Sequence, residues 1–217
     1  MHTRQLLTPS GTLQFPAYVP VTTFGNKYPL DGLIQPYLPR IAQAVMVSHH
    51  YARQMTKRPR IPLMIDSGGF AALFEGSQIL EEGGLGVLEI HLGETPERLT
   101  PWDVLEFQET HADLAFTLDF PIPPGLPLKE ARKWQKLTIA NALWALHNRR
   151  RSEMKLFACV QGWDPKSFGR GAAAYKKAKF DGIALGGMVP RARDRALVLD
   201  CVRAVRKEIP DLPLHVF

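Results

Sequence analysis

The stretch from Ile61 to Phe70 reads IPLMIDSGGF, and the rest of the chain is interpreted outward from it. Its first half is a short apolar run of the kind that a buried parallel strand needs. Asp66, Ser67 and two glycines follow where this strand ends, and α/β folds bind their ligands at such ends. Phe70 adds a flat apolar face beside the acid. The alternative, for this stretch taken alone, is a simple turn in which Asp66 and Ser67 cap backbone N–H groups.

Apolar runs of strand length recur on both sides of this stretch. Helical segments separate them, most clearly at 128–148, where Ile139, Ala142, Leu143 and Leu146 share one face. This alternation predicts an α/β protein with a parallel sheet and right-handed crossovers. The indicated strands end near residues 21, 47, 65, 118, 160 and 185 and at the C-terminus. Seven strands are one short of an eight-stranded barrel. An open doubly wound sheet is the alternative, which the lack of a G-x-G-x-x-G after a first strand disfavours.

Other segments carry weaker signals. Residues 6–15 predict a hairpin, and residues 31–40 predict a short helix interrupted by Pro36 and Pro39. Residues 75–99 predict a long irregular segment with one strand at 87–90, because they contain five glycines: Gly76, Gly83, Gly84, Gly86 and Gly93. Further helices are predicted from Thr100 to about Thr110, over 165–179, and around 198–205.

Composition limits the protein class. The 217 residues are 45% hydrophobic and 22% charged, which predicts one globular domain with a sizeable core. The longest apolar runs fall short of a membrane span, and no signal region follows Met1, so a cytoplasmic protein without a membrane partner is expected. Cys159 and Cys201 form no C-x-x-C. The net charge of +6 favours polyanions, with phosphate contacts predicted at the clusters Arg149, Arg150, Arg151 and Lys176, Lys177, Lys179.

Four predicted strand ends share one chemical character. Together they offer two carboxylates, one amide, exposed backbone N–H groups and one aromatic ring, carried by Asp66-Ser67-Gly68-Gly69-Phe70, Asp119, Gln161-Gly162 and Gly186-Gly187. A guanine-like base matches this set, because a carboxylate accepts from its N1–H and amine while an amide or backbone N–H donates to its carbonyl. An aromatic ring stacks on the base. Each motif alone also fits a cap or a tight turn, but four at successive strand ends favour a ligand site.

These stretches, together with Pro16-Ala17-Tyr18-Val19-Pro20-Val21 and Thr117-Leu118-Asp119, resemble those of the tRNA-guanine transglycosylases (queuine tRNA-ribosyltransferases), in the same order and at compatible spacings. The resemblance implies an α/β fold of (β/α)8 TIM-barrel type. It also implies an enzyme that exchanges guanine in a nucleic acid for a 7-deazaguanine base. Asp66 would then be the catalytic acid/base and Asp119 would bind the guanine edge. Gln161 and the backbone around Gly186 and Gly187 would bind the carbonyl side of the base, with Ser67, Gly68, Gly69 and Gly162 also binding the substrate. Phe70 would stack on one face of the base and Phe217 on the other.

The sequence also departs from the family pattern. The family's nucleophilic Asp and its zinc site, Cys-x-Cys-x-x-Cys with a later His, fall beyond Phe217. The expectation is therefore one barrel domain over 1–217 without the eighth strand, the zinc subdomain or a cofactor, inactive by itself. Ala71 replaces the usual Gln. The predicted partners are tRNA or DNA, a guanine or 7-deazaguanine base, and a homo- or hetero-oligomer. A DNA-directed enzyme and a non-catalytic base-binding subunit remain the alternatives.

Overall fold

A parallel sheet forms the centre of the computed structural model, which describes residues 5–91 and 96–217. Met1 and Gly93 lie outside the described residues. The sheet has six strands in the order β11-β10-β9-β8-β4-β3. Their bounds are β3 (Val45–Ser48), β4 (Leu63–Asp66), β8 (Leu114–Phe116), β9 (Lys155–Val160), β10 (Gly182–Leu185) and β11 (Leu214–Val216).

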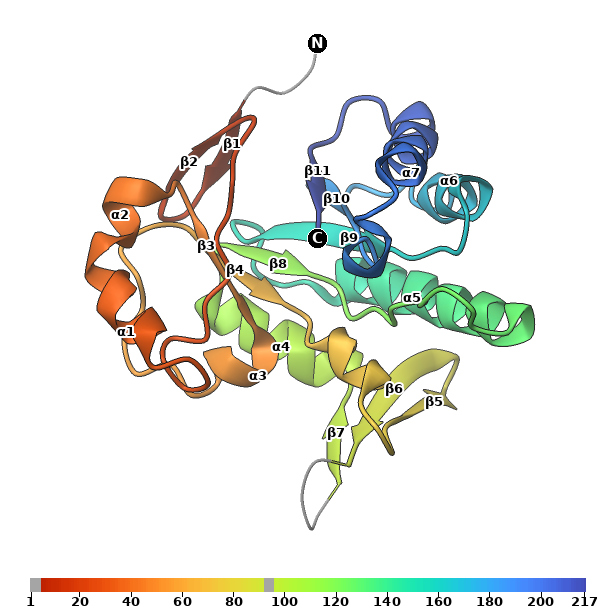
Figure 1. Ribbon diagram of the computed structural model, residues 1–217, viewed down its shortest axis with the longest axis horizontal. Helices are drawn as coiled ribbons and strands as arrows, with labels where there is room; N and C mark the ends of the chain where they lie inside the picture. Colours follow the sequence, from red (N-terminus) through yellow and green to blue (C-terminus); the bar gives the residue numbers. More distant parts are fainter. Residues whose placement is uncertain (1–4, 92–95) are drawn as a thin grey trace.

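The strand order settles the choice between the two sheet architectures. Every strand of this sheet pairs with the parallel strand that precedes or follows it along the chain, without a reversal. A doubly wound sheet requires a reversal of strand order, so that alternative is wrong. The sheet curls as it crosses the molecule (Figure 1), so the described residues form an open, singly wound α/β sheet of the type that barrels use.

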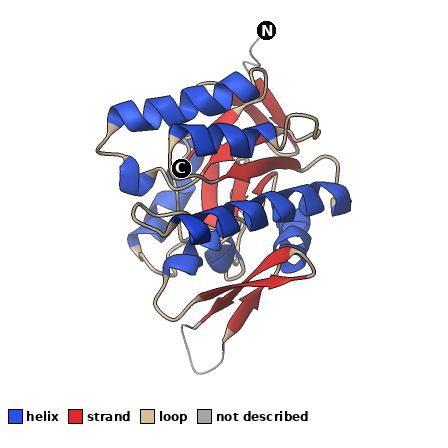
Figure 2. Ribbon diagram, turned by 90° about the vertical axis from the view of Figure 1, so that its right-hand side faces the viewer, coloured by secondary structure: helices blue, strands red, loops and turns tan. Residues whose placement is uncertain are grey.

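Helices cover the outer side of the curled sheet (Figure 2). Three of them begin at capping side chains that the sequence displays. Thr100 and Asp103 form a capping box, Asp164 and Ser167 form a second, and Asp194 accepts from the N–H of Leu197. The helices are α3 (His49–Ala52), α4 (Pro101–His111), α5 (Leu128–Asn148), α6 (Pro165–Ala173) and α7 (Arg195–Glu208). The helix predicted over 165–179 is therefore shorter than expected.

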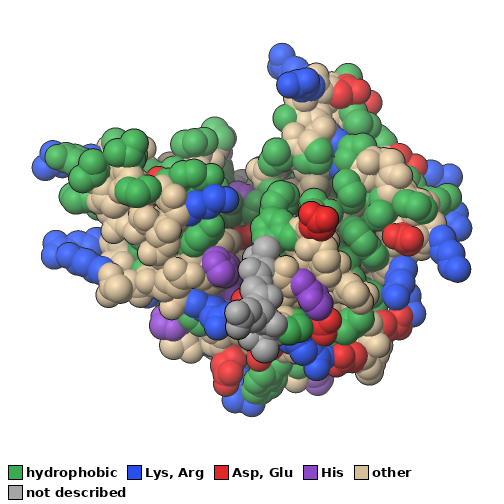
Figure 3. All heavy atoms as spheres, turned by 60° about the horizontal axis from the view of Figure 1, so that its bottom comes forward, with side chains coloured by type: hydrophobic (Ala, Val, Ile, Leu, Met, Phe, Trp, Pro, Cys, Tyr) green, Lys and Arg blue, Asp and Glu red, His purple; other side chains and the backbone are tan. Residues whose placement is uncertain are grey.

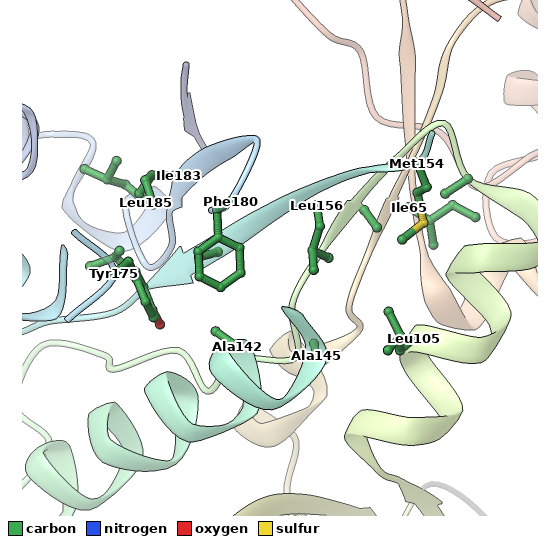
Figure 4. Packing of buried hydrophobic residues seen from close by; sticks show 14 of the residues in the cluster. Ile65, Leu105, Ala142, Ala145, Met154, Leu156, Tyr175, Phe180, Ile183 and Leu185 are labelled. Atoms are coloured by element: carbon green, nitrogen blue, oxygen red, sulfur yellow. The ribbon is translucent and has the colours of Figure 1, made fainter. Parts of the chain in front are cut away.

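Both faces of the sheet are buried, which explains the continuous apolar character of its strands. Side chains such as Ile65, Leu156 and Ile183 point toward α4–α7 and form the larger core (Figure 4). The alternate positions, among them Phe116 and Phe157, face the concave side and pack with each other at 5.9 Å between ring centroids. The hairpin β1 (Gln5–Thr8) and β2 (Gly11–Gln14), predicted from the sequence, places Leu13 in this second cluster.

One prediction near the N-terminus needs correction. The first expected strand, ending at residue 21, contributes only an isolated parallel bridge between Val21 and Met46, because Pro16 and Pro20 have no N–H to donate to a ladder. The helix predicted over 31–40 is interrupted as expected, and it forms three short pieces, α1 (Leu30–Ile34), η1 (Gln35–Tyr37) and α2 (Leu38–Ile41). Pro36 and Pro39 lie in the first turns of η1 and α2, where Pro is tolerated.

The glycine-rich segment 75–99 is more ordered than predicted. It forms a three-stranded antiparallel sheet of β5 (Gln78–Glu82), β6 (Leu85–Ile90) and β7 (Glu97–Leu99). Gly83 and Gly84 form the turn between the first two strands, with φ of +57° and +83°. That pair of positive φ angles is typical of a tight hairpin turn. The glycines by themselves predict a loop, because their role in a hairpin depends on pairing that the sequence does not display.

The described residues include no helix that is both long and apolar enough to cross a membrane.

Candidate functional site

A pocket of about 430 Å³ opens at the carboxyl edge of the parallel sheet. Seven of the residues predicted from the sequence line it, namely Asp66, Phe70, Asp119, Gln161, Gly186, Gly187 and Phe217. Figure 3 shows the lower face of the molecule, on which apolar side chains lie among acidic, basic and His side chains. The curl of the sheet therefore brings together strand ends that are up to about 150 positions apart in the chain.

The remaining predicted residues support the pocket from behind. The Ser67 hydroxyl donates to Asp119 Oδ1 at 3.0 Å and accepts from the Gly69 N–H at 3.2 Å. Gly68 has φ of +81°, and it precedes the 3-10 helix η2 (Gly69–Leu73) that carries Phe70. A side chain at position 69 would collide with the carbonyl oxygen of Asp119, so glycine is required there. A β-carbon at position 162 would come within 2.8 Å of the Phe168 ring.

The Asp119 carboxylate is held at both oxygens. Gln161 Nε2 donates to Oδ2 at 2.6 Å, while Ser67 occupies Oδ1. The amide of Gln161 is itself oriented, because its Oε1 accepts from the Ile122 N–H at 3.3 Å. A carboxylate oxygen has two acceptor sites, so each oxygen of Asp119 retains one for a ligand. The pair Asp119–Gln161 therefore presents acceptors beside a donor amide in fixed geometry.

The two acids of the pocket are strongly perturbed. Burial, together with the negative charge of Asp119, raises the pKa of Asp66 from 3.8 to about 7. Burial also raises the pKa of Asp119, against the opposing hydrogen bonds from Gln161 and Ser67. A carboxyl group with a pKa near 7 exists in both protonation states at neutral pH, which suits a general acid or base. Asp66 is thus chemically fit for proton transfer, while Asp119 is built to accept hydrogen bonds.

The raised pKa of Asp66 predicts a pH-dependent stability. The folded protein binds a proton more tightly than the unfolded chain, so stability is fully present below pH 4 and declines as the pH rises to about 7. The slope contributed by one such group is at most about 1.4 kcal/mol per pH unit. Urea unfolding of the wild type and of Asp66→Asn between pH 4.5 and 8 measures it. The variant is expected to lose this decline, and identical profiles would contradict the assignment.

Aromatic and apolar side chains form the walls of the pocket. Phe70 is 59% exposed and meets Phe74 edge-on at 6.0 Å. Phe217 is anchored by the rings of His215 and Phe116, at 4.6 and 5.0 Å. The sequence analysis missed six apolar lining residues, Leu73, Pro121, Ile122, Pro123, Val189 and Pro190. The prolines after two strand ends were the available signal. The site suits a flat ligand with one polar edge and apolar faces.

The predicted phosphate-binding clusters lie elsewhere. Residues 149–151 precede β9 and residues 176–179 precede β10, so both clusters are at the amino edge of the sheet, opposite the pocket. Arg149 forms an ion pair with Asp181, and Arg151 donates to the carbonyl oxygens of Glu109 and Ala112. The structure does not bring these cations to the pocket. Within residues 5–91 and 96–217, no three His, Cys, Asp or Glu side chains are grouped so as to hold a metal ion.

Fold and site together define a singly wound parallel α/β protein with a pocket at the carboxyl ends of its strands. The sequence model of the family described as queuine tRNA-ribosyltransferase matches residues 2–217. The chain belongs to this family.

Curated relatives agree with this assignment. The chain is 26% identical over 202 residues to a queuine tRNA-ribosyltransferase of Thermus thermophilus, covering 85% of this chain and 51% of the relative. It is 26% identical over 204 residues to that of Herpetosiphon aurantiacus, covering 85% and 50%. It is 24% identical over 210 residues to the queuine tRNA-ribosyltransferase of Stenotrophomonas maltophilia, covering 85% of this chain and 53% of the relative. The chain thus spans about half the length of the curated relatives it matches.

Proposed function

We propose that this chain provides the base-binding part of a transglycosylase that exchanges guanine in tRNA for a 7-deazaguanine base. The observation that supports this proposal most is the convergence of Asp119, Gln161 and the Gly186–Gly187 backbone on the pocket that also contains Asp66. We further propose that the curled sheet belongs to an eight-stranded barrel in the whole protein, because its strand order is that of a barrel.

The base is bound through complementary edges. Asp119 accepts hydrogen bonds from N1–H and from the exocyclic amine, because each of its oxygens has one free acceptor site. Gln161 and the backbone N–H of Gly187 lie at the base carbonyl, where donors are required, while the N–H of Gly186 donates to the Val160 carbonyl and keeps the strand end in place. Phe70 and Phe217 stack on the two faces of the ring, which gives affinity without specificity.

The reaction requires a proton at the departing base and a nucleophile at the sugar carbon. Asp66 transfers the proton, because its pKa near 7 lets it change protonation state at neutral pH. A second carboxylate displaces guanine, forming a covalent intermediate that the incoming base then attacks. By analogy with the family pattern, we expect that nucleophile beyond residue 217.

Two experiments test the proposal. In the first, calorimetric titration of the 217-residue chain is expected to show guanine binding, and adenine serves as the matched control because it lacks the N1–H and the 2-amine. Protein extended to the length of its relatives is then incubated with labelled guanine and either tRNA or DNA. Label in tRNA supports the proposal, and label in DNA alone supports the DNA-directed alternative. Guanine binding without incorporation supports a non-catalytic base-binding subunit.

Salt dependence locates the nucleic-acid contacts. Arg193 and Arg195 are exposed on the segment that carries the pocket residues Val189 and Pro190. We expect Arg193/Arg195→Ala to reduce the slope of log affinity for tRNA against log salt by about 0.7–0.9 per lost contact. The triple variant Lys176/Lys177/Lys179→Ala tests the cluster predicted from the sequence, which is on the opposite edge. A slope that falls only in the lysine variant would place the nucleic acid there instead.

A further inference from the structure

Arg191 is a buried arginine that sequence analysis did not single out. It is 5% exposed, and it ends the 3-10 turn η3 (Val189–Arg191) between β10 and α7. Its guanidinium donates to three backbone carbonyls: Nη1 to Gly187 at 2.6 Å, and Nη2 to Ile122 at 3.0 Å and to Gly162 at 3.3 Å. Each carbonyl belongs to a different loop, following β10, β8 and β9 respectively.

These three loops shape the pocket. Ile122 and Gly187 line it directly, and Gly162 follows the lining residue Gln161. A planar guanidinium with several fixed donors can hold three carbonyls in one arrangement, whereas the ammonium of lysine cannot reproduce that fork. Gly187, with φ of +68°, lies so close to the guanidinium that a β-carbon there would approach Nη1 to 3.3 Å. The loop therefore folds directly onto this side chain.

Arg191 also lacks the partner that a buried arginine usually has. Among the residues that the structure describes, no carboxylate forms an ion pair with it. Burying a cation without a carboxylate partner is costly, and the hydrogen bonds to the three carbonyls offset part of that cost. The free energy spent at this position therefore goes into tying three loops together.

We propose that Arg191 is a positioning residue for base binding, which fixes the loops after β8, β9 and β10 relative to one another so that Gln161, Ile122 and Gly187 keep the places in the pocket that base binding requires. This inference rests on the proposed function, since it assigns Arg191 a role in that same pocket. Supporting side chains of this kind set the geometry of a site without touching the ligand.

The test compares Arg191→Met, Arg191→Lys and the matched control Arg203→Met in the 217-residue chain. Arg203 is an exposed arginine of α7, with 73% of its side chain accessible. Guanine affinity is measured by calorimetry, the free energy of unfolding by urea, and loop order by amide hydrogen exchange. We expect Arg191→Met to bind guanine about five- to tenfold more weakly, with faster exchange over 120–123, 162–164 and 187–190 and unchanged exchange in β9. Arg191→Lys is expected to recover part of the affinity, and Arg203→Met is expected to change neither the guanine affinity nor the loop exchange.

The outcomes separate this inference from the proposed function. Unchanged guanine affinity in Arg191→Met overturns it, as does weaker binding without faster loop exchange. If Arg191→Met does not fold, Arg191→Lys decides: wild-type affinity and exchange in that variant overturn the inference, since lysine cannot hold all three carbonyls. If the wild type binds no guanine, the proposed function fails. The exchange data then still test whether Arg191 fixes the loops, and uniform protection in Arg191→Met would reject that as well.

Discussion

Asp119→Asn is expected to weaken guanine binding by on the order of 1–3 kcal/mol, about 5- to 150-fold. The amide replaces an acceptor with a donor that opposes the N1–H of the base. It also disturbs the pocket itself, because an NH₂ group in place of Oδ2 would face the donor Nε2 of Gln161, now 2.6 Å away. Both effects act in a buried site, where an unpaired polar group is most costly. Calorimetric titration with guanine measures the loss.

Asp194→Asn is the matched control for this experiment. This variant makes the same carboxylate-to-amide change at the N-cap of α7, outside the pocket. Asparagine is as good a cap as aspartate, so α7 should be unaffected. Its guanine affinity should equal that of the wild type. Equal affinity in Asp119→Asn would show that Asp119 does not recognise the base.

Gly186→Ala is the second substitution with a large expected effect. A methyl group at this position would overlap the amide of Gln161 and come within 3.0 Å of Asp119 Oδ2. Gln161 must then rotate away, which breaks its hydrogen bond to Asp119 and removes the donor from the base carbonyl. The expected loss of guanine affinity is on the order of 1–3 kcal/mol. Because Gln161 also lowers the pKa of Asp119, that pKa should rise further in the variant.

Gly32→Ala supplies the comparison for this variant. Gly32 lies in α1 with no atom within 4 Å of an added β-carbon, and alanine is a better helix former than glycine. Its guanine affinity should be unchanged. The two effects of Gly186→Ala are measured separately, by calorimetry and by the carboxyl resonance of Asp119 followed against pH by NMR. Wild-type values for both would mean that the Gln161–Asp119 contact does not organise the pocket.

Much of the fold was predictable because its signals are local. Apolar runs marked the six strands of the sheet, and the capping residue Thr100 marked the start of α4. The predictions failed where pairing overrode local character. Glycines 83 and 84 indicated a loop and instead form a hairpin turn. Pro16 and Pro20 interrupted a run that looked like a strand, leaving only the bridge from Val21.

The candidate site divides in the same way. By itself the sequence determined that Asp66, Asp119, Gln161 and Gly186–Gly187 follow strands, because each motif adjoins the apolar run that forms its strand. Only the tertiary structure decided which of these residues is fit to transfer a proton and which is built to accept hydrogen bonds. The curl of the sheet places the carboxyl of Asp66 in the field of Asp119, and burial then raises its pKa to about 7. Arg191, Arg193 and Arg195 look equivalent in the sequence. In the structure, Arg193 and Arg195 are exposed, whereas Arg191 is buried and donates hydrogen bonds to three loop carbonyls. Burial, charge coupling and hydrogen bonding act between residues that are distant along the chain. The chemical properties of these residues therefore depend on the tertiary packing that brings them together.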